Sequence, residues 1–304
     1  MSTVAITQDR DAIGGAIAEG LGHMPLERLV RGRYVAVKPN DTWASKEDTT
    51  AVTQPDTLRA VLEEVVRCEP RQLVVTGGAG AAETEDVFRL SGMLDVVREF
   101  DVELIDHNRP PFTEVKLEYA PDRDVAGPQK SVMVNRRVLE YETLIVVSQL
   151  KMHATATVTL ALKNIAMSYP AADYYGHPRG NGRLHRNAFF DDMHSFIAAM
   201  SRRFPIDLAI TVGHPAMVAT GPIGGYVAET GLAIVSTDAL AADVVGARLL
   251  GFDPQAVRHL WEADRLELGE TDTDHMTFPA MTLTEAIEAF TEAVYGERLS
   301  FEHS

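Results

Sequence analysis

Short apolar runs alternate with amphipathic stretches along most of the chain. The apolar runs are four to six residues long and rich in valine, isoleucine and leucine, which predicts strands covered on both faces. We expect strands over residues 34–37, 72–75, 102–105, 143–147, 207–212 and 232–235. Helical patterns cover residues 56–68, 85–100 with a break near Gly92, 187–203, 238–250 and 284–295. This alternation predicts an α/β protein with a mostly parallel central sheet and helices on both faces.

Two stretches interrupt the alternation. Residues 108–130 are rich in proline and charge, which indicates a long excursion or a small antiparallel insertion. Residues 168–187 hold glycine, tyrosine, histidine and arginine without a clean period, as in a functional lid or a segment without fixed structure. Since no linker is recognisable, we expect one α/β domain over residues 1–304, with an insertion around residues 108–130.

Composition narrows the classes of partner. The 304 residues include 28 Lys and Arg against 44 Asp and Glu, a net charge of −16 at pH 7. This balance argues against binding to nucleic acid or to an anionic membrane surface. No apolar run approaches the ~20 residues that cross a bilayer, and residues 1–11 lack the basic and apolar sections of a secretion signal. We therefore expect a cytoplasmic protein whose partner is a small molecule or another protein, including a second copy of this chain.

The cysteine count limits the cofactors. Cys68 is the only cysteine, which excludes an internal disulfide framework and an iron–sulfur cluster ligated by this chain's cysteines alone. The cofactor is left unknown, with a divalent metal as one option.

Polar residues follow five of the predicted strands, at residues 38–41, 77–80, 148–153, 213–215 and 237–238. The carboxyl ends of parallel strands meet at one edge of a sheet, where ligands bind in open α/β folds. We therefore expect these loops to form one polar pocket. The glycine-rich turn at residues 77–80 lacks the spacing of a nucleotide-binding fingerprint and is interpreted as a tight turn.

Three lysines and a histidine are the candidate chemical groups. Lys38 ends a strand, and Lys151 and His153 point the same way if their strand continues. Burying a cation beside a titratable ring is costly, which favours a functional role for that pair. Lys163 lies in an apolar stretch, either with its stem on the surface and its head in water or as a pocket lysine with altered acidity.

A basic segment stands out in this acidic protein. Residues 177–186 contain Arg179, Arg183 and Arg186 and no acid. Arginine suits bidentate binding of carboxylate or phosphate, so we interpret the segment as a clamp that closes over an anion. The alternative is a solvated basic loop.

A metal site is a secondary possibility. His177, His185 and Asp191 carry the nitrogen and oxygen ligands that divalent metals accept. Asp191 is equally explained as a first-turn acid favoured by the helix dipole.

Two further features complete the candidate set. Residues 221–225 form a glycine-rich turn in which Gly221 and Gly224 permit a close backbone approach to a ligand. Asp238 fits a helix cap and Asp243 lies further inside the same helix; either could orient His153.

Taken in order, these segments resemble domain-of-unknown-function family 362. The resemblance runs from about residue 35 to residue 268 and rests on residues 38–40, 50–55, 150–153, 162–164, 221–224 and 236–243. It implies an α/β domain, which in some members carries ferredoxin-type cysteine motifs and is described as iron–sulfur. This chain lacks those cysteines and departs at Val212 and Met167, where the family often has aspartate and glycine.

The residues favour an enzyme that binds a small carboxylate or phosphate at the carboxyl ends of the strands. Asn40, Asn164 and the lysines would hold the anion, with Arg179 and Arg183 as the clamp. His153 would exchange protons, assisted by Lys151, Lys163 and Asp238 in isomerisation, elimination or related chemistry. The alternative is a non-catalytic accessory protein that binds a small molecule, a metal or a cluster; an electron-transfer accessory is disfavoured by the cysteine count.

Overall fold

The computed structural model describes residues 1–120, 130–172 and 192–299. Within these residues, ten strands form the main sheet. They are β1 (Ser2–Gln8), β2 (Tyr34–Pro39), β3 (Gln72–Gly77), β4 (Glu103–Asp106), β7 (Thr143–His153), β8 (Thr157–Thr159), β9 (Leu208–Val218), β10 (Tyr226–Ala228), β11 (Leu232–Ser236) and β12 (Met276–Thr277). A separate pair, β5 (Phe112–Lys116) and β6 (Ser131–Asn135), is antiparallel. Strand β5 lies within the stretch predicted as an excursion or antiparallel insertion, and β6 follows that stretch directly.

Helices flank the main sheet. They are α1 (Ile13–Gly22), α2 (Leu26–Val30), α3 (Pro55–Arg67), α4 (Thr84–Ser91), α5 (Met93–Glu99), α6 (Ala161–Ser168), α9 (Met193–Arg203), α10 (Ala239–Leu249), α11 (Arg258–Arg265) and α12 (Leu283–Tyr295). The predicted break within residues 85–100 is confirmed: Gly92 separates α4 from α5 with a φ of 82°, a left-handed conformation that glycine adopts without steric cost.

The sheet is mostly parallel, as predicted. Its order is β12-β1-β11-β9-β7-β2-β3-β4, and β4, β3, β2, β7 and β9 run parallel to one another. Strand β11 is antiparallel to both of its neighbours, β9 and β1. The carboxyl end of β11 therefore lies at the opposite edge of the sheet from the carboxyl ends of the five parallel strands.

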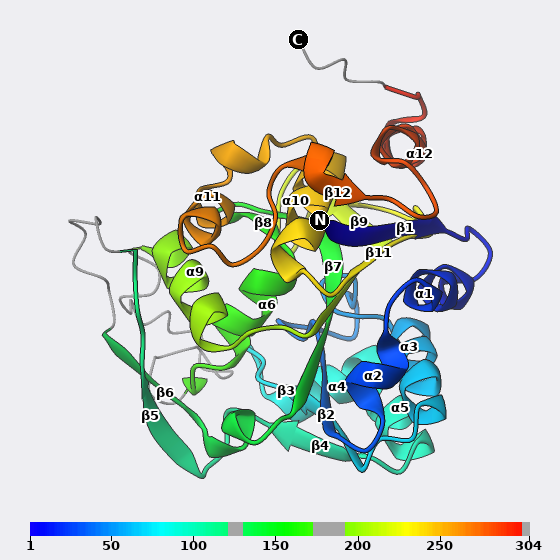
Figure 1. Ribbon diagram of the computed structural model, residues 1–304. Helices are drawn as coiled ribbons and strands as arrows, with labels where there is room; N and C mark the ends of the chain where they lie inside the picture. Colours follow the sequence, from blue (N-terminus) through cyan, green and yellow to red (C-terminus); the bar gives the residue numbers. More distant parts are fainter. Residues whose placement is uncertain (121–129, 173–191, 300–304) are drawn as a thin grey trace.

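Alternating side chains divide the core into two layers. Val35 and Val37 of β2 pack into a cluster with α1, α3, α4 and α5, whereas Ala36 belongs to a cluster with α6, α9, α10 and α11. Figure 1 shows α1, α3 and α5 on one side of the sheet and α6, α9 and α11 on the other. This three-layer arrangement explains why the strands are apolar on both faces.

All six predicted strands are present, and the sequence also contains elements that its pattern did not predict. Strand β1 is not among the predicted strands, yet Val4 to Gln8 pair with β11. Helix α6 lies in a stretch read only as apolar. No helix in the described part of the chain combines the length and the apolarity that a bilayer span requires.

Candidate functional site

One cavity lies where β2, β3 and β7 end, between the loops that follow them and helix α6. Its volume is about 280 Å³. The described residues that line it are Asn40, Asp41, Thr42, Gly78, Gly80, Ala81, His153, Thr159, Lys163, Asn164, Met167, Ser168, Met193 and Pro222. The structure thus brings Asn40, His153, Lys163 and Asn164 of the predicted site together at the predicted edge of the sheet.

Helix α6 is held in place by an aspartate from another helix. Leu160 at the N-cap of α6 supplies no side-chain cap. Instead, the carboxyl group of Asp243 on α10 accepts hydrogen bonds from the N–H groups of Ala161 at 2.8 Å and Leu162 at 2.9 Å. Burial raises the pKa of Asp243 to about 7. Because Lys163 is the next residue, this contact fixes the part of α6 that faces the cavity.

Lys163 is a buried cation for which the described residues supply no counter-ion. Its exposed fraction is 6%, and within the described residues its Nζ makes no hydrogen bond and no ion pair. Burial lowers the pKa of Lys163 to about 8. Its place in the first turn of α6, at the positive end of the helix dipole, acts in the same direction. The ammonium group of Lys163 is therefore mostly charged at pH 7 and loses its proton as the pH rises above about 8.

His153 presents a hydrogen-bond donor to the cavity. Its Nδ1 accepts the backbone N–H groups of Thr155 and Ala156, each at 3.0 Å. Burial, and then the positive charges of Lys163 and Lys151, lower the pKa of His153 to about 2. The ring is therefore neutral with its proton on Nε2. A ring in this state stabilises negative charge by donating, so the geometry favours a donor role over the predicted proton exchange.

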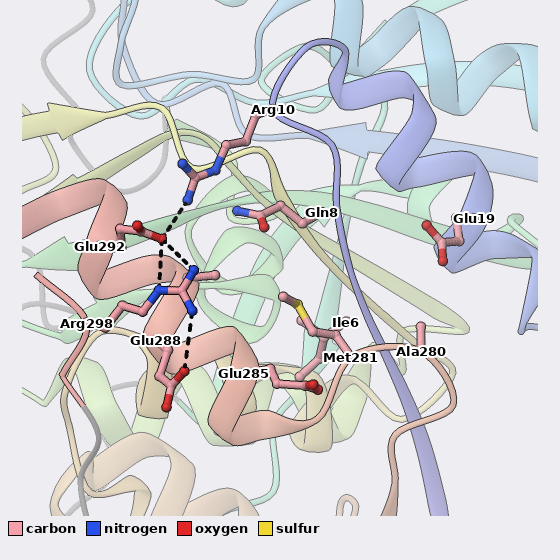
Figure 2. Close-up of a pocket in the computed structure, with 11 residues that line it drawn as sticks. Ile6, Gln8, Arg10, Glu19, Ala280, Met281, Glu285, Glu288, Glu292 and Arg298 are labelled. Carbon is pink, nitrogen blue, oxygen red and sulfur yellow. Dashed lines mark hydrogen bonds and ion pairs between the residues drawn. The ribbon is translucent and has the colours of Figure 1, made fainter. Parts of the chain in front are cut away.

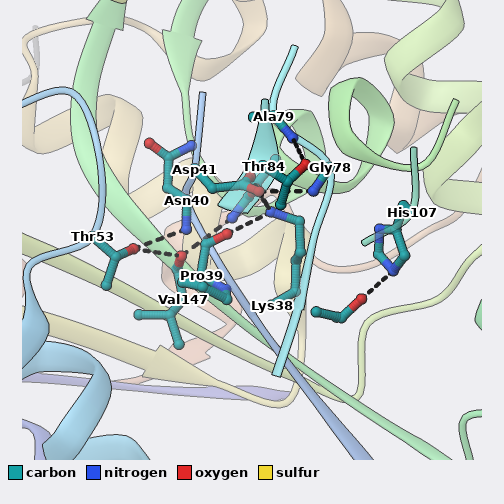
Figure 3. A network of polar contacts seen from close by, with 12 residues as sticks. Lys38, Pro39, Asn40, Asp41, Thr53, Gly78, Ala79, Thr84, His107 and Val147 are labelled. Atoms are coloured by element: carbon teal, nitrogen blue, oxygen red, sulfur yellow. Dashed lines mark hydrogen bonds and ion pairs between the residues drawn. The ribbon is translucent and has the colours of Figure 1, made fainter. Parts of the chain in front are cut away.

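Lys38 is fully buried and lies at the centre of a network of polar contacts (Figure 3). Its Nζ donates to Asp41 Oδ1 at 2.6 Å, to Asn164 Oδ1 at 3.2 Å and to the carbonyl of Pro39. The other Asp41 oxygen accepts the N–H of Gly78 at 2.7 Å. Lys38 thus neutralises Asp41 and orients residues of the wall, but it does not line the cavity.

Lys151 also lies one layer behind the wall. Strand β7 continues past the predicted end at residue 147 to His153, with an irregularity between Gln149 and Lys151. Lys151 Nζ donates to Ala51 O at 2.8 Å, Asn40 Oδ1 at 3.1 Å and Gln149 Oε1 at 3.3 Å. Burial and the charge of Lys163 lower the pKa of Lys151 to about 7. Its contact with the cavity is indirect, through Asn40.

The structure does not bring Asp238 to the cavity. Strand β11 runs opposite to β9, so the residues after β11 emerge at the far edge of the sheet. There Asp238 caps α10, accepting the N–H of Ala241 at 3.0 Å, and it also accepts the hydroxyl of Ser2 at 2.6 Å. The sequence pattern located a strand end but not the direction of the strand.

The glycine-rich turn at residues 221–225 contributes Pro222 to the cavity wall, and not its glycines. Pro222 lines the cavity, whereas Gly221 and Gly224 do not. Gly221 packs against the carbonyl of Met152, where a Cβ would clash, and its own carbonyl accepts the N–H of Ala154 at 3.0 Å. Gly221 therefore lets the turn approach the end of β7 closely.

The predicted clamp and metal ligands, Arg179, Arg183, His177, His185 and Asp191, lie outside the described residues. Within the described ranges, no group of three histidine, cysteine, aspartate or glutamate side chains is arranged to hold a metal ion.

Ten of the described lining residues were not among the predicted site residues: Asp41, Thr42, Gly78, Gly80, Ala81, Thr159, Met167, Ser168, Met193 and Pro222. Asp41 follows the strand end that provided Lys38 and Asn40, so its position was a usable signal. Met167 stands four residues after Lys163, the spacing of one helix face, but that signal required predicting α6.

A second, more open hollow lies between β1, α1 and α12 (Figure 2), with a volume of about 710 Å³. Its arginines are paired locally: Arg10 lies 3.4 Å from Glu292, and Arg298 lies 3.2 Å from Glu292 and 4.0 Å from Glu288. Charges that satisfy one another at the surface do not distinguish a site, so we take the cavity at the ends of β2, β3 and β7 as the candidate.

Comparisons with known proteins concern most of the chain. A thylakoid-associated protein of Synechocystis sp. is 24% identical over 250 residues, which are 82% of this chain and 72% of the relative. Two solved structures each match 80% of this chain. A Thermotoga maritima protein has 14% sequence identity and a TM-score of 0.46. The lactate racemase apoprotein of Thermoanaerobacterium thermosaccharolyticum has 11% sequence identity and a TM-score of 0.48. The matches span only 59% and 56% of those two chains. The family described as Domain of unknown function (DUF362) matches residues 35–248. This match covers more than half of the sequence, and the chain belongs to that family.

Proposed function

We propose that the cavity binds a small carboxylate or phosphate and that the protein is an enzyme that transfers a proton at a carbon beside a carbonyl group. The observation that carries this proposal is Lys163, a buried ammonium group for which the described residues supply no counter-ion. Burying an unpaired charge is expensive, and a ligand of opposite charge would offset that cost.

The charge of the cavity wall supports an anionic ligand. Asp41 is neutralised by Lys38 at 2.6 Å, and the pKa of about 2 leaves His153 neutral. Among the described lining residues, Lys163 thus provides the excess charge. His153 Nε2–H is a second donor for the same anion.

The same two groups suit proton transfer. With a pKa of about 8, Lys163 has an accessible amine form that can take a proton from carbon. A neutral His153 can donate to the oxygen on which negative charge develops. Binding uses the ammonium form of Lys163 and proton abstraction uses the amine form. Affinity should therefore fall as the pH passes through about 8. The exchange rate of bound ligand should rise at a higher pH, because a bound anion raises the pKa of Lys163.

Pyruvate is a suitable probe because its methyl protons lie beside a carbonyl. We expect the protein to accelerate deuterium exchange of that methyl group in D₂O, followed by proton NMR, and to bind pyruvate and phosphate in calorimetry. Lys163→Met should abolish exchange and weaken binding at least tenfold. The control Lys46→Met removes an exposed lysine and should change neither.

Two outcomes contradict the proposal in different ways. Binding that depends on Lys163 without exchange of pyruvate or its longer 2-oxo homologues would favour the non-catalytic, ligand-binding alternative. Unchanged binding in Lys163→Met would remove the anion site itself.

A further inference from the structure

Apolar side chains line the cavity beside its polar groups. Met167, Met193, Pro222 and Ala81 line the same space as Lys163. Met167 stands four residues after Lys163 on α6, so both side chains project from one face of that helix. At about 1.5 Å per residue, the two positions are about 6 Å apart along the helix axis.

We propose that the ligand of this cavity is a monocarboxylate with a short unbranched apolar tail, its carboxylate at Lys163 and His153 and its tail against Met167 and Met193. This inference rests on the proposed anion site and specifies the class of molecule that fills it.

The size of the cavity sets the length of the tail. A volume of about 280 Å³ lies below the usual range for drug-sized ligands of about 300–1,000 Å³. It corresponds to about nine water molecules at about 30 Å³ each. A carboxylate with a tail of three to five carbons fits that space and reaches from Lys163 past Met167.

The described wall offers no free cation to a second carboxylate beside the methionine side chains. Lys38 is paired with Asp41. Lys151 donates to three protein acceptors, of which Asn40 is one. A dicarboxylate would place a charge against the methionine side chains without a partner from the described wall, which carries a large desolvation penalty. Methionine is flexible and polarisable, so it packs well against unbranched chains of slightly different length.

The test is a calorimetric series of acetate, propionate, butyrate, valerate and hexanoate with the full-length protein at pH 7. Burial of each methylene group should tighten binding about fourfold, until the tail fills the cavity and the gain stops. Succinate and glutarate should bind at least tenfold more weakly than butyrate and valerate, which have the same numbers of carbons.

Two variants separate the ends of the ligand. Lys163→Met should weaken the whole series by a similar factor. Met167→Ser should leave acetate unchanged and reduce the gain per methylene in the longer acids. Leu139→Ser, which alters an apolar side chain that is 44% exposed and away from the cavity, is the matched control and should leave the series unchanged.

The outcomes distinguish this inference from the proposed function. Equal affinities along the series, or dicarboxylates that bind as tightly as monocarboxylates, with binding still dependent on Lys163, would overturn the apolar-tail inference and leave the anion site standing. Absence of binding by every carboxylate and by phosphate would overturn both. The carboxylate titrations with the unmodified protein test the apolar-tail inference even if Met167→Ser does not fold.

Discussion

Lys38 and Lys163 are both buried at the same end of the sheet, but their surroundings differ. Lys38 is 0% exposed and paired with Asp41 at 2.6 Å, whereas Lys163 is 6% exposed and has no hydrogen-bond partner among the described residues. The contrast teaches that burial of a charge does not by itself mark a site. A cation satisfied on all sides holds the structure together, and a cation left unsatisfied beside a cavity is available to a ligand.

The largest expected effect comes from breaking the satisfied pair. Lys38→Met leaves the carboxylate of Asp41, 2% exposed, without its cation, and should lower the free energy of unfolding by about 3–5 kcal/mol. Urea unfolding measures this. The double variant Lys38→Met/Asp41→Leu should recover much of the loss, and a double variant as unstable as the single one would contradict the assignment of Lys38 to structure.

Replacing Lys163 should change the free energy of unfolding in the opposite direction. Its pKa is lowered from 10.5 to about 8, so the folded state binds this proton less well than the unfolded state. The resulting cost is fully present below pH 8 and disappears above about pH 10.5. Lys163→Met should therefore stabilise the ligand-free protein by about 1–3 kcal/mol at pH 7, with a smaller gain as the pH rises. A destabilised variant at pH 7 would show that Lys163 is satisfied after all.

A smaller effect is expected where α6 is anchored. Asp243→Asn replaces one of two acceptor oxygens by a donor and should destabilise the protein by about 1–2 kcal/mol at pH 5. Because burial raises the pKa of Asp243 from 3.8 to about 7, the native protein loses stability as the pH rises through that window. The difference from the variant should shrink accordingly in unfolding curves between pH 4 and pH 8.

The control for this change lies on the same helix. Asp238→Asn weakens the cap of α10, not that of α6, so it should leave the reactivity of Lys163 toward amine reagents unchanged. Asp243→Asn should shift the pH dependence of that labelling to lower pH, because less negative charge opposes the helix dipole. Identical labelling profiles for the two variants would mean that Asp243 has only a structural role.

The smallest effect is expected at a paired cation on the surface. His214 lies 2.9 Å from Asp56 and 2.7 Å from Glu229, and the hydrogen bond to Asp56 is the main cause that raises its pKa above 6.5. Its contribution is complete below pH 6.5 and is lost as the pH rises through the raised pKa. His214→Gln should lower stability by at most about 1 kcal/mol at pH 6 and not at pH 9. A loss that is equal at both pH values would show that charge is not involved.

The sequence was informative where a local pattern decides the outcome. The apolar runs located the parallel strands, and the residues after them located the edge that carries Asn40 and His153. Strand direction depends on pairing between distant segments, which a local pattern does not record, so Asp238 was assigned to the wrong edge. Which cations are paired was equally hidden, because nothing near Lys38 or Lys163 in sequence shows that Lys38 pairs with Asp41 and that Lys163 faces a cavity. Helix α6 was missed since its cap comes from Asp243, 82 residues after Ala161.

The reversed strand has a consequence for synthesis on the ribosome. Val4 of β1 pairs with Ser236 of β11, so β1 emerges long before the strand that will hold it. Strands β2, β3 and β4 can associate as soon as they leave the exit tunnel, whereas β1 must wait with an unpaired apolar edge until most of the chain has been made. The growing chain is therefore exposed to aggregation through β1. A ribosome-associated chaperone that shields this strand should raise the yield of folded protein.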